Sequence, residues 1–420
     1  MVPDNATVGV VGAGTMGAGI AEAAARAGCP VRLHDPFPDA VARGLERIER
    51  SLRRSVERQS LDREQAEAIL GRLEPAETLE ALGGCRFVIE AAPEDRALKE
   101  DLFRRLDAVC PAPAVLASNT SSLSITGIGA AVADPGRVVG MHFFNPAPVM
   151  RLVEVIAGAR SAPAAVEAAS ALARLMGKTP VRASDTPGFI VNRVARPYYG
   201  EALRLLGENI AGVETIDAIM RAVGFRMGPF EVIDLVGVDV NLAVTRSVWE
   251  ATFFEARYRP HAIQQRLVEA GLLGRKTGAG FYTYDADGQS LGPTVLATGV
   301  GIGPAPGAAM GEALPSRSGP ALAVALRLSA AGVPVDCGST GVAARMLAML
   351  VNEAILAADD GVAEPAGIDD ALRLGANHPR GPFEWLSMLG PGLVLAVMDG
   401  LSDWYREERY RPAPGLRRRA

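Results

Sequence analysis

Two side chains twelve positions apart could work together as a base and its partner. His142 lies in an apolar run that starts at Val138, and Glu154 lies in the next apolar run, beyond the turn-forming Asn145–Pro148. If the two runs are adjoining strands, the imidazole and the carboxylate come within hydrogen-bond reach. Such a carboxylate fixes the tautomer of a neutral imidazole and stabilises the imidazolium that forms when the ring accepts a proton. The pair therefore predicts a general base that removes a hydroxyl proton.

The polar residues around this pair also have structural interpretations. A lone histidine before two phenylalanines could be a core residue, but Glu154 in the adjoining run favours chemistry. Ser121, within the polar run Ser118–Ser122, could cap a turn. Asn192 lies inside an apolar helical segment, where an amide without a hydrogen-bond partner is costly, so we expect it to have a polar role.

The chain opens with a strand, turn, helix and strand of the kind that binds a dinucleotide. The apolar run Val8–Val11 breaks into a Gly-x-Gly-x-x-Gly turn and a helix of small residues, and a second apolar run, Val31–His34, stops at Asp35. The first glycine permits the tight turn, the second lets backbone amides approach a pyrophosphate, and the third lets the helix lie close to the strand. The residues expected to bind the dinucleotide are Gly12, Gly14, Thr15, Met16, Gly17 and Asp35.

The acidic residue favours NAD over NADP. Asp35 lies eighteen residues after Gly17, where its carboxylate can accept hydrogen bonds from the adenosine ribose. Its charge would repel a 2′-phosphate, and Pro36 beside it supplies no cation. NAD is therefore the predicted cofactor, which matches a base that takes the proton of an alcohol while a hydride leaves the carbon.

The elements that must position these residues form an alternating part and a helical part. Residues 7–183 alternate strands with helices, but 40–73 is polar with apolar residues at helical spacing, which predicts an inserted helical arm. From Asp185 onward the pattern is helical, and 285–320 is rich in Gly and Pro. We predict an α/β Rossmann-type NAD-binding domain with an inserted helical arm, followed by two copies of an all-α domain. The predicted boundaries are 1–185 for the first domain (arm at about 38–75), 186–284 for the first helical copy, 285–318 for a linker and 319–420 for the second copy.

The duplication is predicted from residues that recur at a nearly constant offset. The matching segments are Arg193–Glu201 with Arg345–Glu353, Ile216–Asp217 with Ile368–Asp369, Gly228–Glu231 with Gly381–Glu384 and Arg257–Pro260 with Arg409–Pro412. Ala344 stands at the place of Asn192, and the second copy has no counterpart of Lys276, so it cannot be a second active site. We expect it to pack on the first copy in place of a partner's domain.

Size and composition restrict the classes of partner. With 420 residues the chain should hold more than one domain, and its net charge of −5 gives no reason to expect nucleic acid. No apolar stretch is expected to reach transmembrane length, and residues 1–7 lack the pattern of a secretory signal. The four cysteines have no metal-ligand spacing. We expect a cytoplasmic protein without a metal ion, nucleic acid or membrane as partner.

Taken together, these residues resemble the short-chain L-3-hydroxyacyl-CoA dehydrogenases. The resemblance spans 7–284 and rests on the glycine turn, Ser118–Ser122, His142–Pro146, Asp185–Arg193 and Arg275–Gly278. It implies that His142 is the catalytic base with Glu154 as its partner, and that Ser121 and Asn192 hold the substrate oxygen. The other NAD contacts it implies are Glu94, Lys99, Ser121, Asn145 and Lys276, and the coenzyme A contacts are Ser51 and Arg58.

The resemblance differs from the simplest interpretation at several of these positions. Without it, Glu94 and Lys99 would be an exposed helical pair, and the arginines of the arm would be a solvated helix face. The family often has lysine where this chain has Arg58, so the charge is retained while the geometry changes.

The implied reaction is the oxidation of (S)-3-hydroxyacyl-CoA to 3-oxoacyl-CoA with NAD. Duplicated bacterial members resemble enzymes of fatty-acid and phenylacetate catabolism, so the expected substrates are 3-hydroxybutyryl-CoA and 3-hydroxyadipyl-CoA. The resemblance also implies an oligomer, because single-copy members of the family form homodimers through the helical domain. A homo-oligomer is therefore expected for this chain too. Two alternatives stay open: a related dehydrogenase of a free hydroxy acid or sugar acid, and a non-catalytic NAD-binding protein.

Overall fold

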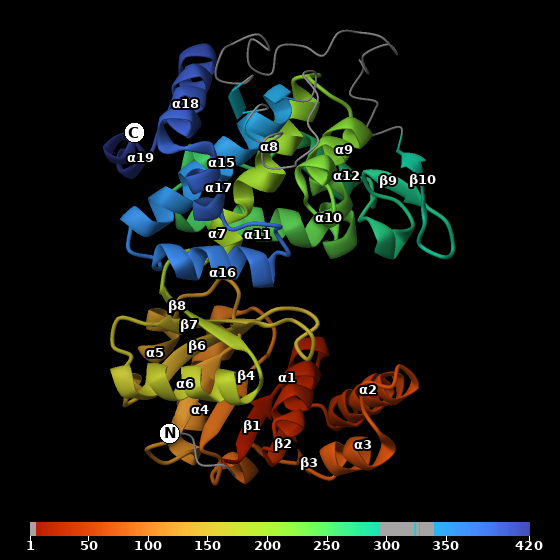
Figure 1. Ribbon diagram of the computed structural model, residues 1–420. Helices are drawn as coiled ribbons and strands as arrows, with labels where there is room; N and C mark the ends of the chain where they lie inside the picture. Colours follow the sequence, from red (N-terminus) through yellow and green to blue (C-terminus); the bar gives the residue numbers. More distant parts are fainter. Residues whose placement is uncertain (1–5, 295–322, 325–326, 328–339) are drawn as a thin grey trace. The chain divides into compact units, whose positions relative to one another are not determined.

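The computed structural model describes residues 6–294, 323–324, 327 and 340–420, and the chain forms two compact units (Figure 1). The N-terminal unit is Met1–Phe189 and the helical unit is Ile190–Ala420. This division falls a few residues after the predicted boundary at 185.

An eight-stranded sheet forms the centre of the N-terminal unit, in the order β3-β2-β1-β4-β5-β6-β7-β8. The strands are β1 (Val8–Val11), β2 (Val31–His34), β3 (Leu73–Ala76), β4 (Phe87–Glu90), β5 (Val115–Ser118), β6 (Val138–Phe143), β7 (Leu152–Ala157) and β8 (Thr179–Ser184). All neighbouring strands are parallel except β6 and β7. Most are almost entirely buried because helices cover both faces, which explains their unbroken apolar runs. The predicted Rossmann-type fold is confirmed.

The helices of this unit connect the strands. They are α1 (Thr15–Arg26), α2 (Pro38–Glu57), α3 (Arg63–Leu70), η1 (Leu79–Leu82), α4 (Arg96–Val109), α5 (Ile125–Gly129), η2 (Pro135–Arg137) and α6 (Pro163–Leu175). The predicted arm corresponds to α2 and α3, which lie together beside α1 (Figure 1). The prediction is wrong at its end, because Leu73–Ala76 is the edge strand β3 rather than part of a helical arm.

The helical unit contains two sets of helices. The first set is α7 (Val191–Val194), α8 (Arg196–Gly207), α9 (Val213–Val223), α10 (Pro229–Val236), α11 (Val238–Ala251), η3 (Ala256–Tyr258), α12 (Ala262–Glu269) and η4 (Arg275–Thr277). The second set is α15 (Thr340–Asp359), α16 (Pro365–Gly375), α17 (Pro382–Leu389), α18 (Pro391–Tyr405), η5 (Glu408–Tyr410) and α19 (Pro414–Arg419). The recurring residues occupy the same places in both sets: Asp217 and Asp369, for example, each accept a hydrogen bond from the second residue of the following helix.

The two sets pack against each other in one hydrophobic core, with α8 lying against α15. Buried residues of the first set, such as Met220 and Phe230, share this core with Met346 and Trp385 of the second. The prediction that the second set packs on the first is confirmed.

The predicted linker is only partly described. Its start is not a linker, because β10 (Ser290–Pro293) pairs with β9 (Tyr282–Tyr284) in an antiparallel hairpin. Residues 295–318 lie outside the described residues, as does most of 319–339.

One segment corrects the expectation about apolar length. Gly341–Asp359 in α15 is long and apolar enough to cross a membrane, and so is the bent pair α17 and α18 if taken as one span. Most of the Gly341–Asp359 segment is buried inside the protein, as in the core helix of a globular unit.

Candidate active site

The glycine turn after β1 has a geometry that requires glycine twice. Gly12 has φ +99°, and a Cβ on Gly17 would lie 1.7 Å from the carbonyl oxygen of Gly12. A Cβ on Gly14, in contrast, would meet no atom within 4 Å. The open space at Gly14 lies directly before Thr15 and Met16, the first residues of α1, where free amides favour an anion. The turn therefore fits the pyrophosphate of a dinucleotide.

Asp35 lies beside this turn, immediately after β2. Its Oδ2 accepts a hydrogen bond from the backbone N of Ala13 at 2.8 Å, and its Oδ1 accepts one from the backbone N of Phe37 at 3.0 Å. A carboxylate has lone pairs for further donors, so Asp35 is held in place and can still accept ribose hydroxyls. These contacts fit NAD.

His142 and Glu154 meet across the antiparallel strands β6 and β7. The two residues are directly opposite in register, and Nδ1 of His142 lies 2.6 Å from Oε2 of Glu154. His142 is 7% exposed and Glu154 is fully buried. Because the acceptor faces Nδ1, the neutral ring carries its proton there and has its lone pair on Nε2. The predicted contact between the two side chains is confirmed.

The topology of the sheet brings the other predicted residues of this unit to the same edge. Strands β1, β2, β5 and β6 all run in the same direction. The glycine turn follows β1, Asp35 follows β2, Ser121 follows β5, and His142 lies near the end of β6. In open α/β sheets the carboxyl ends of the strands form the ligand-binding edge.

Glu94 holds the loop that contains Ser121. Its Oε1 accepts hydrogen bonds from Thr120 Oγ1 (2.7 Å), Ser121 N (2.9 Å) and Ser122 N (3.0 Å). Burial alone would raise the pKa of Glu94, but the hydrogen bond from Thr120 and the charge of Lys99 outweigh burial and hold that pKa below its usual value. Glu94 is thus an ionised support beneath the loop.

Lys99 is not the exposed helical residue of the simpler interpretation. It is 1% exposed, and its Nζ lies 2.5 Å from Glu90 Oε1 and 3.5 Å from Glu94 Oε2. Glu90 is fully buried and also accepts a hydrogen bond from Ser118 Oγ. Glu90 is not among the residues predicted from the sequence, although an acid at the end of the apolar run Phe87–Ile89 is a signal for such a role.

The loop after His142 is held by a second buried lysine. Lys178 Nζ donates to the carbonyl oxygens of Ala147 (2.6 Å), Pro148 (3.1 Å) and Met150 (2.9 Å). Burial and the nearby charge of Arg26 lower the pKa of Lys178 to about 8. Asn145, a predicted NAD contact, lies exposed at the start of this loop.

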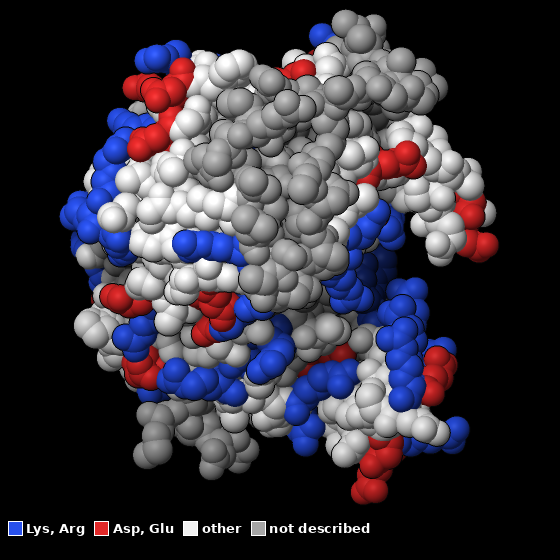
Figure 2. Space-filling view, turned by 45° about the horizontal axis from the view of Figure 1, so that its top comes forward, with Lys and Arg blue, Asp and Glu red and all other residues white. Residues whose placement is uncertain are grey.

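The predicted coenzyme A contacts lie on the arm. Ser51 Oγ donates to Glu22 Oε1 of α1 at 3.0 Å, so this hydroxyl is turned toward α1. Arg58 is exposed at the end of α2. Basic side chains gather at the right of Figure 2, on the side where the arm lies in Figure 1.

Two predicted site residues belong to the helical unit. Asn192 lies in α7 at the start of the unit. Lys276 lies in η4, and its Nζ is 2.6 Å and 2.8 Å from the two carboxylate oxygens of Asp239. The roles predicted for both stay predictions.

No metal centre emerges from the described part of the chain. Within residues 6–294 and 340–420, no group of three or more His, Cys, Asp or Glu side chains could hold an ion. The thiols of Cys29, Cys85 and Cys110 are buried and free, and Cys337 lies outside the described residues.

Family models match nearly the whole described chain. The model for the NAD-binding domain of 3-hydroxyacyl-CoA dehydrogenase matches residues 7–186. The model for the C-terminal domain of the same enzymes matches 188–284 and 342–420.

Individual relatives agree with the family models. The 3-hydroxyadipyl-CoA dehydrogenase of Escherichia coli K12 is 41% identical, across 99% of this chain and 97% of that protein. A 3-hydroxybutyryl-CoA dehydrogenase of Mycobacterium tuberculosis is 42% identical across 66% of this chain and 98% of its own length. A crystal structure of 3-hydroxybutyryl-CoA dehydrogenase from E. coli K12 has a TM-score of 0.85 and 40% identity, and covers 99% of this chain and 98% of that chain. The chain therefore belongs to the 3-hydroxyacyl-CoA dehydrogenase family, and its N-terminal unit carries the NAD-binding domain of these oxidoreductases.

Proposed function

We propose that the protein oxidises (S)-3-hydroxyacyl-CoA to 3-oxoacyl-CoA, with His142 as the general base. The single observation that carries this proposal is the 2.6 Å contact between His142 Nδ1 and Glu154 Oε2 at the carboxyl edge of the sheet. NAD, when bound, supplies the acceptor for the hydride that leaves the hydroxyl-bearing carbon.

The protein supplies the proton chemistry. Nε2 of His142 accepts the hydroxyl proton, because Nδ1 already donates to Glu154. The buried carboxylate then stabilises the imidazolium, whose charge would otherwise be costly because His142 is only 7% exposed. Ser121 and Asn192 orient the substrate oxygen, and Glu94 keeps the Ser121 loop in one conformation.

Coenzyme A is proposed to bind along the arm. The exposed arginines of α2, including Arg54 and Arg58, supply positive charge for its phosphates. Ser51 is the weaker candidate, because its hydroxyl already donates to Glu22.

The second helical set is proposed to be a duplicated domain that replaces the partner subunit's domain within one chain. Support comes from the second match of the C-terminal family model and from the shared core of the two sets. The substrates proposed from the names of relatives are 3-hydroxyadipyl-CoA and 3-hydroxybutyryl-CoA, in cytoplasmic catabolism of aromatic or fatty acids.

The test is NADH formation with 3-hydroxybutyryl-CoA, 3-hydroxyadipyl-CoA and the corresponding free hydroxy acids. Turnover on the CoA esters is expected. Turnover restricted to free acids, or no turnover on any of them, would contradict the proposal.

Replacing the base separates chemistry from binding. His142→Gln should lower kcat on the order of 10²–10⁴-fold while the dissociation constant of NAD changes little, because the ring is not part of the dinucleotide turn. Steady-state kinetics and calorimetric titration with NAD measure the two quantities. A variant with near-normal kcat would exclude His142 as the base.

A further inference from the structure

A buried arginine near Asn192 has no carboxylate partner. Arg196 begins α8, four residues after Asn192, and is 6% exposed. Its Nη1 donates to Thr245 Oγ1 at 3.1 Å, its guanidinium lies 4.9 Å from the centre of the Tyr199 ring, and its Nε has no hydrogen-bond partner. Burial lowers the pKa of this guanidinium.

Arg196 is exceptional among the buried arginines of the described residues. Each of the others forms an ion pair with a carboxylate: Arg137 with Asp107, Arg193 with Glu353, and Arg345 and Arg409 with Glu201. For Arg196 the described residues offer no carboxylate within 4.0 Å. A buried charge without a counter-ion is strongly unfavourable, so an anion supplied from outside the chain would complete this site.

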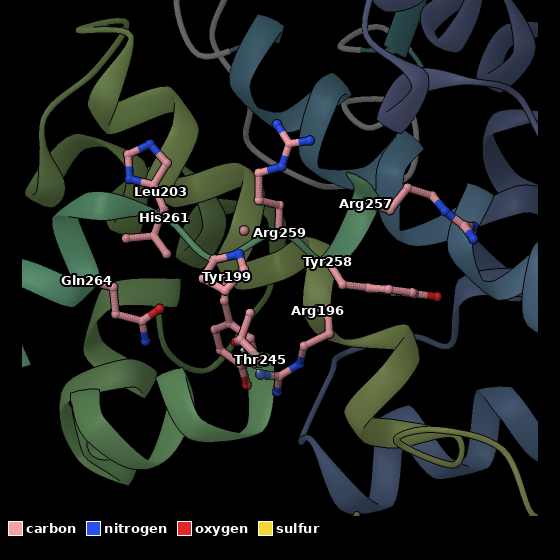
Figure 3. A pocket seen from close by; sticks show the side chains of 11 residues that line it. Arg196, Tyr199, Leu203, Thr245, Arg257, Tyr258, Arg259, His261 and Gln264 are labelled. Atoms are coloured by element: carbon pink, nitrogen blue, oxygen red, sulfur yellow. Dashed lines mark hydrogen bonds between the residues drawn. The ribbon is translucent and has the colours of Figure 1, made fainter. Parts of the chain in front are cut away.

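The arginine lines a narrow hollow of the helical unit (Figure 3). The hollow is narrow and partly open to solvent, and lies between α8, α11 and the segment from η3 to α12. Arg196 is turned toward Thr245 and Tyr199, whereas Arg257 points away, to its ion pair with Glu353 (Figure 3). Among the described lining residues, Arg196 is thus the buried cation without a carboxylate partner.

The second helical set shows that the helical packing does not need this charge. At the same offset that relates Arg193 to Arg345, the counterpart of Arg196 is Ala348, a buried residue of α15. The counterpart of Asn192 is Ala344. The set without the predicted substrate residue therefore lacks the arginine as well, which links Arg196 to the substrate rather than to the fold.

We propose that Arg196 binds the terminal carboxylate of a dicarboxylic acyl chain, so that it selects 3-hydroxy-ω-carboxyacyl-CoA over monocarboxylic acyl-CoA. This inference rests on the proposed function, in which Asn192 lies at the substrate oxygen. Asn192 in α7 and Arg196 at the start of α8 are separated by a junction at Ala195 whose backbone stays in the helical region (φ −80°, ψ −8°), so the four residues rise about 6 Å. In a six-carbon diacid three C–C bonds separate the hydroxyl-bearing carbon from the terminal carboxyl carbon, a span of about 4 Å. A planar guanidinium can accept that carboxylate through two parallel hydrogen bonds.

The distance from the hydroxyl-bearing carbon to the end of the acyl chain also discriminates between the two proposed substrates. A four-carbon 3-hydroxybutyryl chain ends in a methyl group one bond beyond the hydroxyl-bearing carbon, so it cannot neutralise Arg196. Of the two proposed substrates, the geometry favours 3-hydroxyadipyl-CoA.

The experiment compares two acyl chains of equal length that differ at the far end. The quantity is the ratio of kcat/KM for 3-hydroxyadipyl-CoA to that for 3-hydroxyhexanoyl-CoA, in the wild type, Arg196→Met and Arg196→Lys. We expect the ratio to exceed one in the wild type, to fall on the order of 10²-fold in Arg196→Met, and to recover in part in Arg196→Lys. The control Arg266→Met removes an exposed charge of α12 that does not line the hollow, and should leave the ratio within about twofold.

Binding without turnover gives a second readout. Adipyl-CoA and hexanoyl-CoA lack the hydroxyl group, so calorimetric titration measures affinity alone. Arg196→Met should remove the preference for adipyl-CoA. If that variant does not fold, Arg196→Ala serves instead, because alanine occupies the counterpart position in the second set.

Several outcomes would overturn the inference. If kcat/KM falls equally for both substrates in Arg196→Met, or does not fall at all, the ratio stays at its wild-type value. That result would show that Arg196 does not bind the terminal carboxylate. The proposed function fails separately, if the wild type forms no NADH with either CoA ester.

Discussion

At the scale of single residues, the site depends on charges that are buried in pairs. Glu90 has one oxygen against Lys99 Nζ at 2.5 Å and the other against Ser118 Oγ at 2.6 Å. Lys99 also lies near Glu94, which holds the Ser121 loop. Loss of one charge in this group leaves the other without compensation, and the loop loses its support.

Glu90→Gln tests this dependence. The substitution removes the buried partner of Lys99 and should lower the free energy of unfolding by about 3–5 kcal/mol. The matched control is Glu100→Gln on α4, the helix of Lys99, where Arg96 and Glu100 pair at 2.7 Å near the surface and the expected loss is below about 1 kcal/mol. Chemical denaturation of both variants measures the difference, and equal losses would contradict the assignment.

The sequence predicted some of these residues and missed others for a physical reason. The contact of His142 with Glu154 follows from strand alternation and a short turn, both of which are local. The burial of Lys99 depends on Glu90, nine residues away on another element, and periodicity along one helix does not reveal such a pair. A buried lysine therefore looked like a surface residue.

At the scale of elements, the turn between β1 and α1 separates two duties of glycine. A Cβ at position 17 would overlap the carbonyl oxygen of Gly12, whereas a Cβ at position 14 would enter open space. Gly17 is therefore needed for the packing of α1 on β1, and Gly14 leaves space for a ligand.

A pair of alanine substitutions should separate these duties. Gly17→Ala forces α1 away from β1, so we expect a marked fall in Tm and loss of NAD binding. Gly14→Ala should keep Tm within about 2 °C yet weaken NAD binding about 10–100-fold, because its methyl group occupies the approach to the pyrophosphate. Thermal unfolding and titration with NAD are the measurements. Normal NAD affinity in Gly14→Ala would show that the pyrophosphate lies elsewhere.

Element boundaries were predictable where the pattern was strong. The continuous apolar runs of β1 and β2 identify buried parallel strands. β3 (Leu73–Ala76) contains Glu74 and Pro75 because it is an edge strand, and its composition resembles a loop. β10 is likewise exposed, with Gly292 at φ +119°, so its sequence suggested a linker.

At the scale of the whole molecule, a reciprocal network joins the two helical sets. Glu353 of the second set accepts from Arg193, Arg257 and Tyr258 of the first. Glu201 of the first set accepts from the counterparts Arg345, Arg409 and Tyr410 of the second. The repeated residues therefore face each other, as in an interface between two copies.

The network also explains why α15 is long and apolar enough to cross a membrane, although no apolar stretch of that length was expected from the sequence. Of its three charged residues, Asp359 lies exposed at the end of the helix, whereas Arg345 and Glu353 are at most 2% exposed and are neutralised by the other set. The recurring residues of the sequence predicted that the sets pack together, but not that this packing buries a helix of membrane-spanning length.

Matched substitutions in the network should separate stability from catalysis. Glu353→Gln and Glu201→Gln each remove a buried acceptor of two arginines, and each should cost about 3–5 kcal/mol of unfolding free energy. Of these two glutamates only Glu353 pairs with Arg193, the neighbour of Asn192, which also pairs with Asp360. Glu353→Gln should therefore also lower kcat by about tenfold, whereas Glu201→Gln should not. Denaturation and steady-state kinetics measure both effects. Equal kcat values in the two variants would contradict a link between the network and Asn192.

The packing of the two sets should also weaken in acid, through His378. This residue of the second set is 7% exposed, and its ring lies 5.5 Å from that of Tyr198 and 4.9 Å from that of Phe225 in the first set. Burial lowers the pKa of His378 to about 3, against an ordinary value near 6.5. Below pH 6.5 the unfolded chain therefore takes up a proton that the folded chain does not, and stability is lost as the pH falls toward 3.

The loss from His378 between pH 6.5 and pH 4.5 should be about 2 kcal/mol, and His378→Phe should remove it. His261, whose pKa burial lowers to about 4, contributes with the same sign, and Asp217, whose pKa burial raises to about 7, contributes with the opposite sign. Both residues stay in the variant, so their effects cancel in the difference between wild type and His378→Phe. Unfolding free energies across pH 4.5–7.5 give that difference; parallel curves would mean that the His378 ring takes up its proton in the folded state, and that acid does not act on the packing of the two sets through this residue.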